Sequence, residues 1–529
     1  MSPARRDDLV VVAAALAPLA LFLACERQIA GAVGFPLDDS WIHLHFARNL
    51  AEGGGFAYNP GRPVAGSTAP LWTLLLAAGA AVVGPSVALA KAAGVACGVG
   101  AALITRRAAL ALGAPAPLAL VAAVGLLWTG PMAWGALSGM EVTLAALLVA
   151  AALLAHARER LFWSAWWAAL AALARPEAAL LVPCLALARP LGVRRLAAFG
   201  AVTAAALLPV ALFGLWTAGS PFPATAAAKV EGGLLGWLGG LHEPLSVTLL
   251  TRPWRFLAEW VAWLARTQWV LPLALLPGLA IAWRRSGRAL GAVALVLLAH
   301  PLGMAMLAPY RGPAFQEGRY SIHLLPVAFV VLAVVAGAAH PALATGRAHV
   351  APRLSGRVGA TPHLSQATHG PSRPRGPRYN RLAALATTAY LVSAALTLAP
   401  AATRYGWAVQ NIDAMQVHLG RWLDGHVPPT ARLAVNDIGA IAYFSRREIV
   451  DLMGLVTPEI IPYRRRGEGG IVQYLLETCP DHVVIFPAWF PDLAARADLL
   501  EPVYRVRLER NEVAGAAEMV VYRLKRCAV

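Results

Sequence analysis

The stretch that decides the fold reads Phe35-Pro-Leu-Asp-Asp-Ser-Trp-Ile-His-Leu-His-Phe-Ala-Arg-Asn-Leu50, and it carries two adjacent carboxylates, Asp38 and Asp39. It follows an apolar run from Leu9 to Cys25, and a Gly-rich polar run behind it extends to Thr68. Carboxylates are costly in the hydrocarbon core of a membrane, so an acid pair just beyond an apolar run indicates an outer loop that uses its charge. This loop is therefore the first candidate for a functional site.

The composition is that of a membrane protein. The 529 residues are 58% hydrophobic and only 14% charged, with a mean hydropathy of +0.59. Apolar runs of about 16 to 22 residues recur, and each is about long enough to cross a hydrocarbon core of ~30 Å. The net charge of +17 is assigned to basic cytoplasmic loops rather than to nucleic-acid binding, because no basic stripe is interleaved with aromatic residues. These features predict a polytopic α-helical membrane protein.

Charge also fixes the expected topology. Arg5 and Arg6 make the N-terminus basic, so it is expected in the cytoplasm, and the first helix then delivers the acid pair outside. The short apolar segment 69–83 either crosses the membrane or lies along its surface, and only the second placement puts the later basic clusters inside. About eleven crossings are predicted, N-terminus in and C-terminus out. They are expected at 9–25, 87–105, 115–131, 142–156, a hairpin around 175–177 (two crossings), 196–216, 268–283, 289–308, 321–338 and 382–400.

The loops and the tail complete the predicted organisation. A transmembrane domain over 1–400 has an outer loop at 31–86 with juxtamembrane helices, the first of them amphipathic over 40–52, and another outer loop at 217–267. Segment 339–381, which is basic and without acids, is expected to be a disordered cytoplasmic loop. Residues 401–529 are predicted to form an extracytoplasmic soluble α/β domain. Its helix is expected at 405–423 and its strands at 431–435, 449–452, 482–485, 504–508 and 519–524.

The acid pair admits three interpretations. Asp38 and Asp39 can ligate a divalent cation, act as a general base, or cap the helix that begins at Ser40, although a cap explains one aspartate and not two. A zinc site at His43 and His45 is not expected, because side chains two apart on a helix diverge by roughly 200°. Asp39 and His43, four apart, are able to share a ligand.

Other charged residues are candidates with a simpler alternative beside each. Glu141 sits at the mouth of a predicted crossing and is either functional or a helix cap. Arg175 and Glu177 flank a proline and can pair with each other. A further set of outer-loop cations suits a lipid-linked phosphate, with plain solvation or lipid headgroup contact as the alternative. That set is Lys229, Arg311 and Arg319. If the tail is extracytoplasmic, Cys479 and Cys527 can form a disulfide.

An ordered set of motifs resembles the bacterial GT-C glycosyltransferases, in particular the branch that contains the mycobacterial terminal arabinofuranosyltransferase. The first loop carries the longest part of the resemblance, from Asp38 through Arg48, Asn49, Asn59 and Thr68 to Trp72. The other motifs follow in the order of the family: Ser138-Gly-Met-Glu141, Arg175-Pro-Glu177, the Pro221 to Lys229 loop, Gly318-Arg-Tyr320, Val435-Asn-Asp-Ile-Gly439 and Asp451-Leu-Met-Gly-Leu455.

The resemblance implies inverting transfer of a sugar from a polyprenyl-phosphate donor to a cell-envelope glycan or lipid acceptor, on the outer face of a bacterial inner membrane. It implies Asp38 as general base with Asp39 in support. Residues expected near the donor phosphate are Glu141, Lys229, Arg311, Arg319 and Tyr320. Residues expected to bind the acceptor or to structure the loops are Arg48, Asn49, Asn59, Thr68, Trp72, Arg175 and Glu177. A divalent cation (Mg, Mn or Ca) would be held by Asp39 and Glu141.

Departures from the family pattern and rival functions remain open at this point. Ala224 replaces a usual Asn, and His43 and His45 replace a usual Ser and Arg, which leaves the donor and the metal dependence undecided. A flippase of lipid-linked sugars would show mid-membrane charges and repeat symmetry between halves, and neither is evident in the sequence. A non-catalytic binder of lipid-linked glycans is the third alternative.

Overall fold

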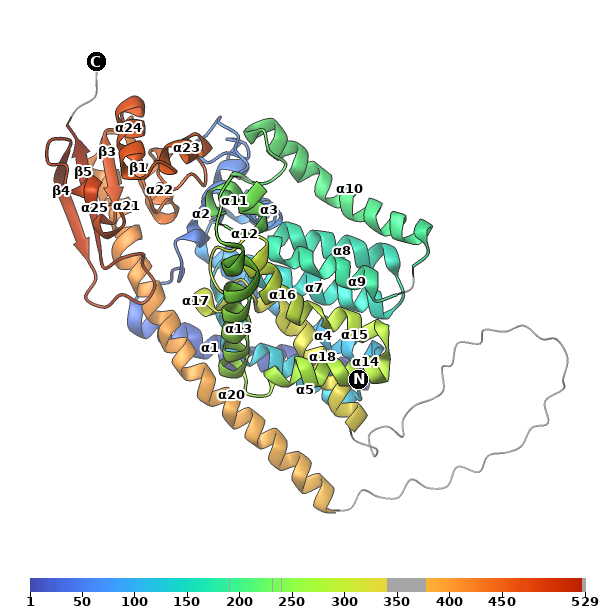
Figure 1. The fold of residues 1–529 in the computed structure, drawn as a ribbon. Helices are drawn as coiled ribbons and strands as arrows, with labels where there is room; N and C mark the ends of the chain where they lie inside the picture. The colour runs from blue at the N-terminus through green and yellow to red at the C-terminus, as the bar shows by residue number, and fades with distance from the viewer. Residues whose placement is uncertain (190, 231, 239, 340–376, 526–529) are drawn as a thin grey trace, which may run out of the picture.

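The computed structural model describes residues 1–189, 191–230, 232–238, 240–339 and 377–525. A helical body and a C-terminal α/β domain lie beside each other, and the long helix α20 (Pro377–Ile412) runs along the body into the domain (Figure 1). Most of the predicted basic loop, and Cys527 with its predicted pairing, fall outside the described residues.

The helical body contains apolar helices of very different lengths. Within the described residues, five helical stretches are long and apolar enough to cross a membrane, or six if α5 and α6, bent by 58° at their junction, form one span. The five are α1 (Pro3–Ala30), α4 (Val87–Ala111), α10 (Val193–Ala218), the stretch Arg288–Met306 and the stretch Phe315–Ala338. Shorter apolar elements include α5 (Ala116–Leu127), α6 (Gly130–Leu137), α7 (Val142–Ala157), α8 (Leu161–Ala174), α9 (Leu181–Leu187), α14 (Leu276–Ser286), α15 (Arg288–Ala294), α16 (Val296–Met306) and α18 (Leu325–Ala339). The eleven crossings and their orientation stay predictions.

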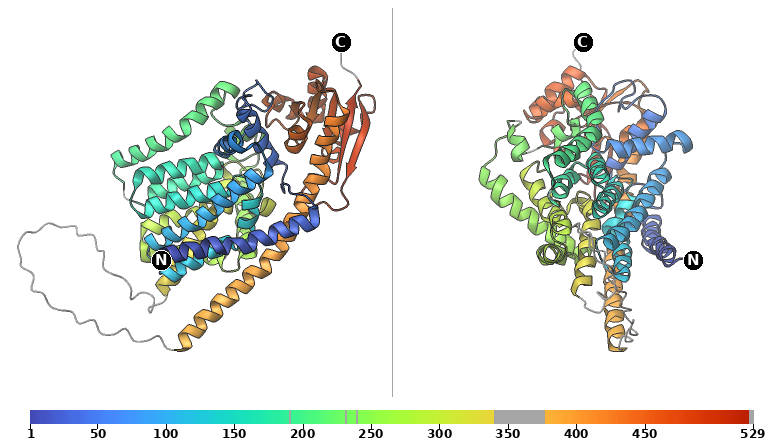
Figure 2. Two further views of the ribbon diagram at one scale, coloured as in Figure 1. Left: turned by 180° about the vertical axis from the view of Figure 1, so that it is seen from behind. Right: turned by 90° about the vertical axis from the view of Figure 1, so that its right-hand side faces the viewer.

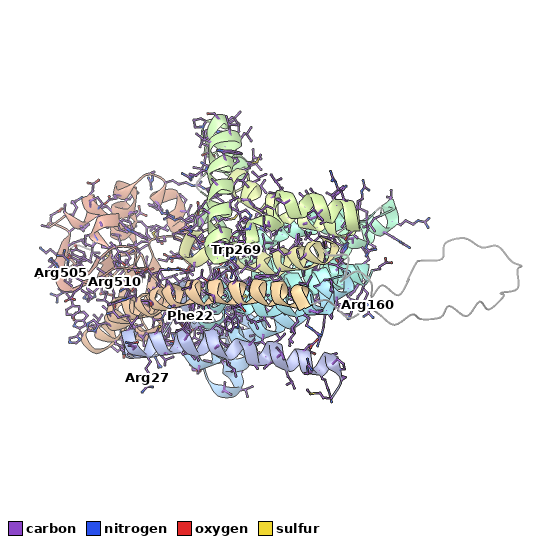
Figure 3. All side chains as sticks on the ribbon, turned by 90° about the horizontal axis from the view of Figure 1, so that it is seen from below. Phe22, Arg27, Arg160, Trp269, Arg505 and Arg510 are labelled. Carbon is purple, nitrogen blue, oxygen red and sulfur yellow. The ribbon has the colours of Figure 1, made fainter. Side chains whose placement is uncertain are left out.

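The basic segments gather at the end of the body away from the C-terminal domain. Arg106, near the end of α4, pairs with Asp7 at 2.5 Å and with Asp8 at 3.2 Å beside the start of α1. Arg189 pairs with Glu159 at 3.0 Å, so the chain returns to this end after the Arg175 turn. Arg160 lies at the opposite end of the molecule from Arg505 and Arg510 of the domain (Figure 3). This is the arrangement that the predicted topology requires.

Helix α2 (Asp39–Ala51) forms where expected, followed by α3 (Pro70–Val83), but its surroundings differ from the prediction. An amphipathic helix at the membrane surface should expose one face, whereas residues 40–49 are all buried. The cause lies far along the chain, because α22 (Gly439–Ser445) of the C-terminal domain packs on α2. Tertiary contacts of this kind cannot be seen in a local periodicity. The exposed face expected of an amphipathic helix is therefore missing from residues 40–49, while the juxtamembrane placement stays a prediction.

The boundary predicted at residue 400 falls inside helix α20. A crossing was expected to end there and a new helix to begin at 405, but α20 continues through Pro400 to Ile412. Helix α1 lies along α20 (Figure 2), and Gly406 permits the close approach because a Cβ there would meet the Cys25 carbonyl oxygen at 2.8 Å. A π-turn (Asp413–Val417) and α21 (His418–His426) follow without a linker.

The C-terminal domain contains a five-stranded sheet in the order β2-β1-β3-β5-β4. The predicted strands are confirmed as β1 (Arg432–Val435), β2 (Glu448–Asp451), β3 (His482–Ile485), β4 (Leu500–Arg507) and β5 (Glu518–Leu524), with β4 starting four residues early. Strands β2, β1 and β3 are parallel, and β5 is antiparallel to β3 and β4. From β1 the chain continues to β2 at one edge of the sheet, whereas from β3 it continues to β4 at the opposite edge.

Further helices connect these parts. In the segment 217–267 they are α11 (Ala224–Lys229), α12 (Gly233–Leu238) and α13 (Arg252–Thr267), while α17 (Phe315–Gly318) precedes α18. In the domain they are α23 (Ile461–Arg464), α24 (Glu468–Thr478) and α25 (Pro491–Ala494).

A buried ion pair joins α1 to α4 inside the helical body. Lys91 Nζ donates to Glu26 Oε1 at 2.5 Å and to Oε2 at 2.7 Å, and Glu26 Oε1 also accepts the Gly34 backbone N–H at 2.9 Å. The two residues are 6% and 1% exposed. Breaking a buried pair leaves an uncompensated charge, which is worse than removing both charges.

Lys91→Met is therefore expected to destabilise the protein by about 3–5 kcal/mol, because Glu26 then lacks its counter-ion. The double variant Glu26→Gln/Lys91→Met should recover most of the loss, because the introduced glutamine amide still accepts from the Gly34 N–H. Thermal unfolding in detergent measures both. Equal melting temperatures for wild type and Lys91→Met would contradict the pairing.

Candidate functional site

A cavity of about 600 Å³ lies where the loop after α1, the later loops of the body and the C-terminal domain meet. Its lining includes the carboxylates of Asp38, Asp39 and Asp437 beside Glu317 and Glu512, and the cations of Lys229, Arg311 and Arg319 beside Arg404 and Arg464. The structure thus brings both predicted catalytic residues and three of the five predicted donor-binding residues to one cavity. The sequence singled out Asp437 only as a member of the motif Val435-Asn-Asp-Ile-Gly439.

Asp38 joins the first loop to the C-terminal domain. Its Oδ2 accepts the Gly439 N–H at 2.6 Å and its Oδ1 accepts the Ala440 N–H at 2.7 Å, at the start of α22. Gly439 has to be glycine, because a Cβ there would overlap the Asp38 backbone oxygen. The Asp38 residue is 7% exposed, and burial together with the neighbouring Asp437 raises the pKa of its carboxyl well above the usual value.

Two of the residues predicted to bind the acceptor or structure the loops hold the first loop on the domain, and a third holds the loop's own turn. Arg48 donates to the Tyr443 carbonyl at 2.7 Å and its guanidinium lies 4.4 Å from the Tyr443 ring centre. Asn59 exchanges two hydrogen bonds with the Ile449 backbone of edge strand β2, at 2.8 and 2.9 Å. Asn49 holds the turn of the loop through the Ala57 and Tyr58 carbonyls. The geometry gives these residues a structural role.

Asp39 points to the cationic part of the cavity. Arg319 Nη1 donates to Asp39 Oδ2 at 2.7 Å, and Arg319 Nη2 donates to the Tyr320 hydroxyl at 3.0 Å. Burial alone would raise the pKa of Asp39, but the charges of Arg319 and Lys229 outweigh it and hold that pKa well below its usual range. Lys229 and Arg311 both lie over the Tyr310 ring, at 5.6 and 5.3 Å.

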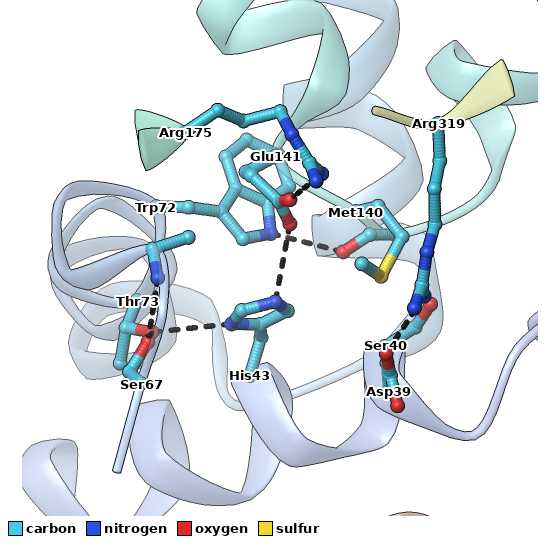
Figure 4. Close-up of polar contacts among 12 residues, drawn as sticks. Asp39, Ser40, His43, Ser67, Trp72, Thr73, Met140, Glu141, Arg175 and Arg319 are labelled. Atoms are coloured by element: carbon cyan, nitrogen blue, oxygen red, sulfur yellow. Dashed lines mark hydrogen bonds and ion pairs between the residues drawn. The ribbon is translucent and has the colours of Figure 1, made fainter. Parts of the chain in front are cut away.

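Glu141 is the centre of a separate buried network (Figure 4). Its Oε1 accepts from Arg175, and its Oε2 lies 3.1 Å from His43 Nε2. Arg175 also reaches Glu177 at 3.2 Å, and its guanidinium lies 4.8 Å from the Tyr320 ring centre, the tyrosine bonded to Arg319. Glu141, Arg175 and Glu177 thus support the cavity from behind and do not line it.

The remaining loop residues predicted to take part are placed as follows. Trp72 is fully buried and its indole N–H donates to the Gly139 carbonyl at 2.9 Å, which ties α3 to the segment before α7. Thr68 lies outside the cavity lining, and its neighbour Ser67 makes the local hydrogen bonds, with Thr73 at 3.0 Å.

A turn with unusual backbone geometry precedes Arg319. Gln316 and Glu317 have φ of 47° and 59°, a region that non-glycine residues rarely occupy and that is often found at functional sites. The turn is held by Arg404, whose guanidinium donates to Glu317 at 2.7 and 3.2 Å, and by the Trp263 indole N–H on the Glu317 carbonyl at 3.2 Å. The residues around 315–318 carry no sequence signal of this strain.

The predicted metal site is not supported by the side chains. Asp39 accepts from Arg319 and Glu141 accepts from Arg175, so the two proposed ligands are each neutralised by an arginine in different networks. No group of three His, Cys, Asp or Glu suited to a metal ion occurs in the part of the chain that the structure describes. The side chains of Asp39 and Glu141 therefore do not form a site for a divalent cation.

Comparison with known proteins finds similarity of fold at low sequence identity. Residues 409–522 match a family described only as a domain of unknown function, DUF8728. No curated protein sequence matches the chain. The structure is similar to ArnT from Cupriavidus metallidurans in its apo state, with a TM-score of 0.56, 15% identity and 98% of each chain covered. ArnT bound to undecaprenyl phosphate gives a TM-score of 0.53 and 15% identity over 97% of each chain.

A second similar structure comes from an archaeon. It is the oligosaccharyltransferase AglB from Archaeoglobus fulgidus, in complex with an inhibitory peptide and a dolichol-phosphate. The TM-score is 0.53 at 13% identity, and the match covers 90% of this chain and 69% of that chain. At these identities the comparisons show that the chain has the fold of these proteins.

The role of Asp38 in anchoring the loop to α22 is tested by comparing an Asp38 variant with the matched variant of Asp39. Asp38→Asn turns one acceptor oxygen into an NH₂ group that faces a backbone N–H, so it should weaken the domain contact by about 1–3 kcal/mol. Amide hydrogen exchange in residues 439–445 should become faster in Asp38→Asn and stay unchanged in Asp39→Asn, because the Asp39 side chain bonds to Arg319 and the α22 backbone N–H groups bond to Asp38. Identical exchange in the two variants would refute the anchoring role, and the contact also means that Asp38→Asn is not a neutral probe of catalysis.

Proposed function

We propose that the protein is a membrane glycosyltransferase that moves a sugar from a polyprenyl-phosphate carrier to a hydroxyl group of a cell-envelope glycan or lipid, with inversion. The observation that carries the proposal is the composition of the 600 Å³ cavity, in which Lys229, Arg311 and Arg319 share one wall with several carboxylates. A transfer of this kind needs cations for the leaving phosphate and a carboxylate for the proton of the acceptor.

The cations match the charge that develops on the donor. When the bond between the sugar and the phosphate oxygen breaks, the carrier phosphate gains a negative charge. Lys229 supplies a point charge and the arginines supply planar guanidinium groups, which suit phosphate oxygens. Tyr310 and Tyr320 hold these cations in place through ring contacts and the Arg319 hydrogen bond. Preorganised cations of this kind stabilise the leaving group without further rearrangement.

Two independent likenesses support the class of donor. The motifs of the first loop and of segments 138–141, 175–177 and 318–320 resemble the GT-C glycosyltransferases in the order of the family. The fold is also similar to structures solved with undecaprenyl phosphate and with dolichol-phosphate. The arabinofuranosyl group is the first sugar to test, because the motifs resemble the terminal arabinofuranosyltransferase branch most.

The proposed location is a bacterial inner membrane, with the cavity and the C-terminal domain on the extracytoplasmic side. The support is the positive-inside rule. The basic segments around Arg106, Arg160 and Arg189 gather at the end of the body away from the domain, as does the basic N-terminus (Figures 1 and 3). The cavity lies at the domain end.

The proposal is tested by measuring the release of undecaprenyl phosphate from a donor. The first donor is undecaprenyl-phosphoryl-arabinofuranose, and the corresponding hexose donors follow. The acceptor is octyl arabinofuranoside and the product is measured by mass spectrometry. Lys229→Gln and Arg311→Gln should each lower kcat/KM about 10- to 150-fold, since a hydrogen bond to a charged group contributes about 1.5–3 kcal/mol. Arg505→Gln, on strand β4 and outside the cavity lining, is the control and should act like wild type.

Wild-type protein that binds undecaprenyl phosphate but releases none from any donor would be a non-catalytic binder, and the proposal would be wrong. Unchanged kcat/KM in both cation variants would place the donor phosphate elsewhere.

A further inference from the structure

The C-terminal domain contributes residues to the cavity that the donor does not require. Asn436 and Asp437 directly follow strand β1, and Trp489 lies shortly after strand β3. Strands β1 and β3 are parallel neighbours, and the chain leaves them toward opposite sides of the sheet. The crevice beyond the carboxyl ends of such strands is where open α/β sheets bind their ligands. The cavity therefore reaches the ligand-binding edge of this sheet.

Two buried amides at this edge have atoms without a partner in the described part of the chain. Asn436 Oδ1 accepts the Phe486 N–H at 3.2 Å, but its Nδ2 donates to nothing. Gln416 Nε2 donates to Asp437 Oδ2 at 2.7 Å, but its Oε1 accepts from nothing. Buried polar atoms in native structures are nearly always satisfied, so a free donor and a free acceptor at a cavity wall mark the positions of ligand groups.

The free atoms suit hydroxyl groups rather than a charged ligand. A hydroxyl can accept from Asn436 Nδ2, and a second hydroxyl can donate to Gln416 Oε1. Trp489 adds an aromatic surface that is 42% exposed, with its indole N–H already bound to the Gly515 carbonyl at 3.0 Å. An aromatic side chain with a few fixed polar groups is the usual composition of a small-molecule site. A polyhydroxylated molecule such as a sugar fits this crevice.

We propose that the acceptor sugar binds in this crevice and that Asp437, not Asp38, removes the proton from its reacting hydroxyl. The proposal rests on the glycosyl transfer proposed above and assigns its acceptor side. Asp38 is unsuited to the role because both of its oxygens accept backbone N–H groups of α22. Asp39 is unsuited because it is bound to Arg319, whose charge makes it a weak base.

Asp38 and Asp437 both line the cavity, and the charge of Asp437 contributes to the raised pKa of Asp38. Burial raises the pKa of Asp437 to about 6, and the negative charges of Asp39 and Asp451 contribute to the rise while the Gln416 hydrogen bond opposes it. A carboxyl with a pKa of about 6 is ionised at neutral pH, so Asp437 is available as a base there. A base with a pKa near the working pH is the most effective one.

The transfer replaces one bond of the anomeric carbon with another. The acceptor oxygen forms a bond to the anomeric carbon while the bond from that carbon to the phosphate oxygen breaks. The hydroxyl proton moves to the Asp437 carboxylate, which becomes neutral. The carrier phosphate leaves as a dianion beside Lys229 and the arginines, and one negative charge has moved from Asp437 to the phosphate.

The test compares Asp437→Asn, Asp437→Glu and Trp489→Ala in the full chain, in the undecaprenyl phosphate release assay described above and across pH 5 to 8. Wild type should lose activity below pH about 6, where Asp437 takes up a proton. Asp437→Asn should lower kcat about 10²- to 10⁴-fold and leave the residual rate independent of pH over this range. Asp437→Glu should restore part of the rate together with the loss of activity at acid pH.

Binding of undecaprenyl phosphate alone shows whether the variants are folded. It should be unchanged in Asp437→Asn, because the introduced asparagine amide can still accept from Gln416. Trp489→Ala should raise the acceptor KM and keep the wild-type pH dependence. An Asp437→Asn protein that retains wild-type kcat, or one that keeps the loss of activity below pH 6, would overturn the assignment. Failure of wild type to release undecaprenyl phosphate from any donor would instead refute the proposed function.

Discussion

Two hydrogen bonds from the backbone of α22 to the Asp38 carboxylate hold the site together. They join residues about 400 positions apart in the chain, and they fix the loop after α1 against the edge of the C-terminal sheet. The Tyr58 hydroxyl adds a bond to the Ile438 carbonyl at 2.5 Å, on the same turn. Asn436 and Asp437 are adjacent to the residues that Asp38 binds, so this contact places their part of the cavity lining next to the acid pair.

The contact also gives the two adjacent aspartates different partners, although the sequence suggested similar roles for both. Asp38 faces the domain and is held there, whereas Asp39, one residue on, faces Arg319 and the cationic wall. Adjacent residues at the start of a helix point in different directions. One pair of carboxylates therefore positions both halves of the cavity, the half suited to a phosphate and the half suited to a hydroxylated acceptor.

Much of the fold follows from local patterns in the sequence. The five strands and the loop order were predictable from apolar periodicity, and the pairing of the far-end basic segments agrees with the positive-inside reasoning. The burial of α2 and the continuation of α20 through Pro400 were not predictable, because both depend on contacts between distant segments. The buried pair of Lys91, near the start of α4, and Glu26, near the end of α1, was missed for the same reason.

The candidate site was predicted in part. Asp38, Asp39, Lys229, Arg311 and Arg319 meet as expected from charge and motif order. Glu141 was predicted to lie near the donor phosphate or a metal, but it binds Arg175 and contacts His43. Arg175 pairs with Glu177, as the sequence allowed, and its second partner Glu141 cannot be read from a list of charged residues. Asp437 could have been found, since an acid directly after a predicted strand, in Asn-Asp-Ile-Gly, is placed at the ligand edge of a parallel sheet. Its contact with Asp38 could not.

The most direct measurement is an experimental structure of the full chain with undecaprenyl phosphate bound. The account predicts that the phosphate lies within hydrogen-bond reach, about 3 Å, of Lys229 and of the Arg311 or Arg319 guanidinium. It predicts that the Asp437 carboxylate remains open to the same cavity. A phosphate bound instead in the separate cavity lined by Arg62, Arg446 and Arg447 would contradict the account.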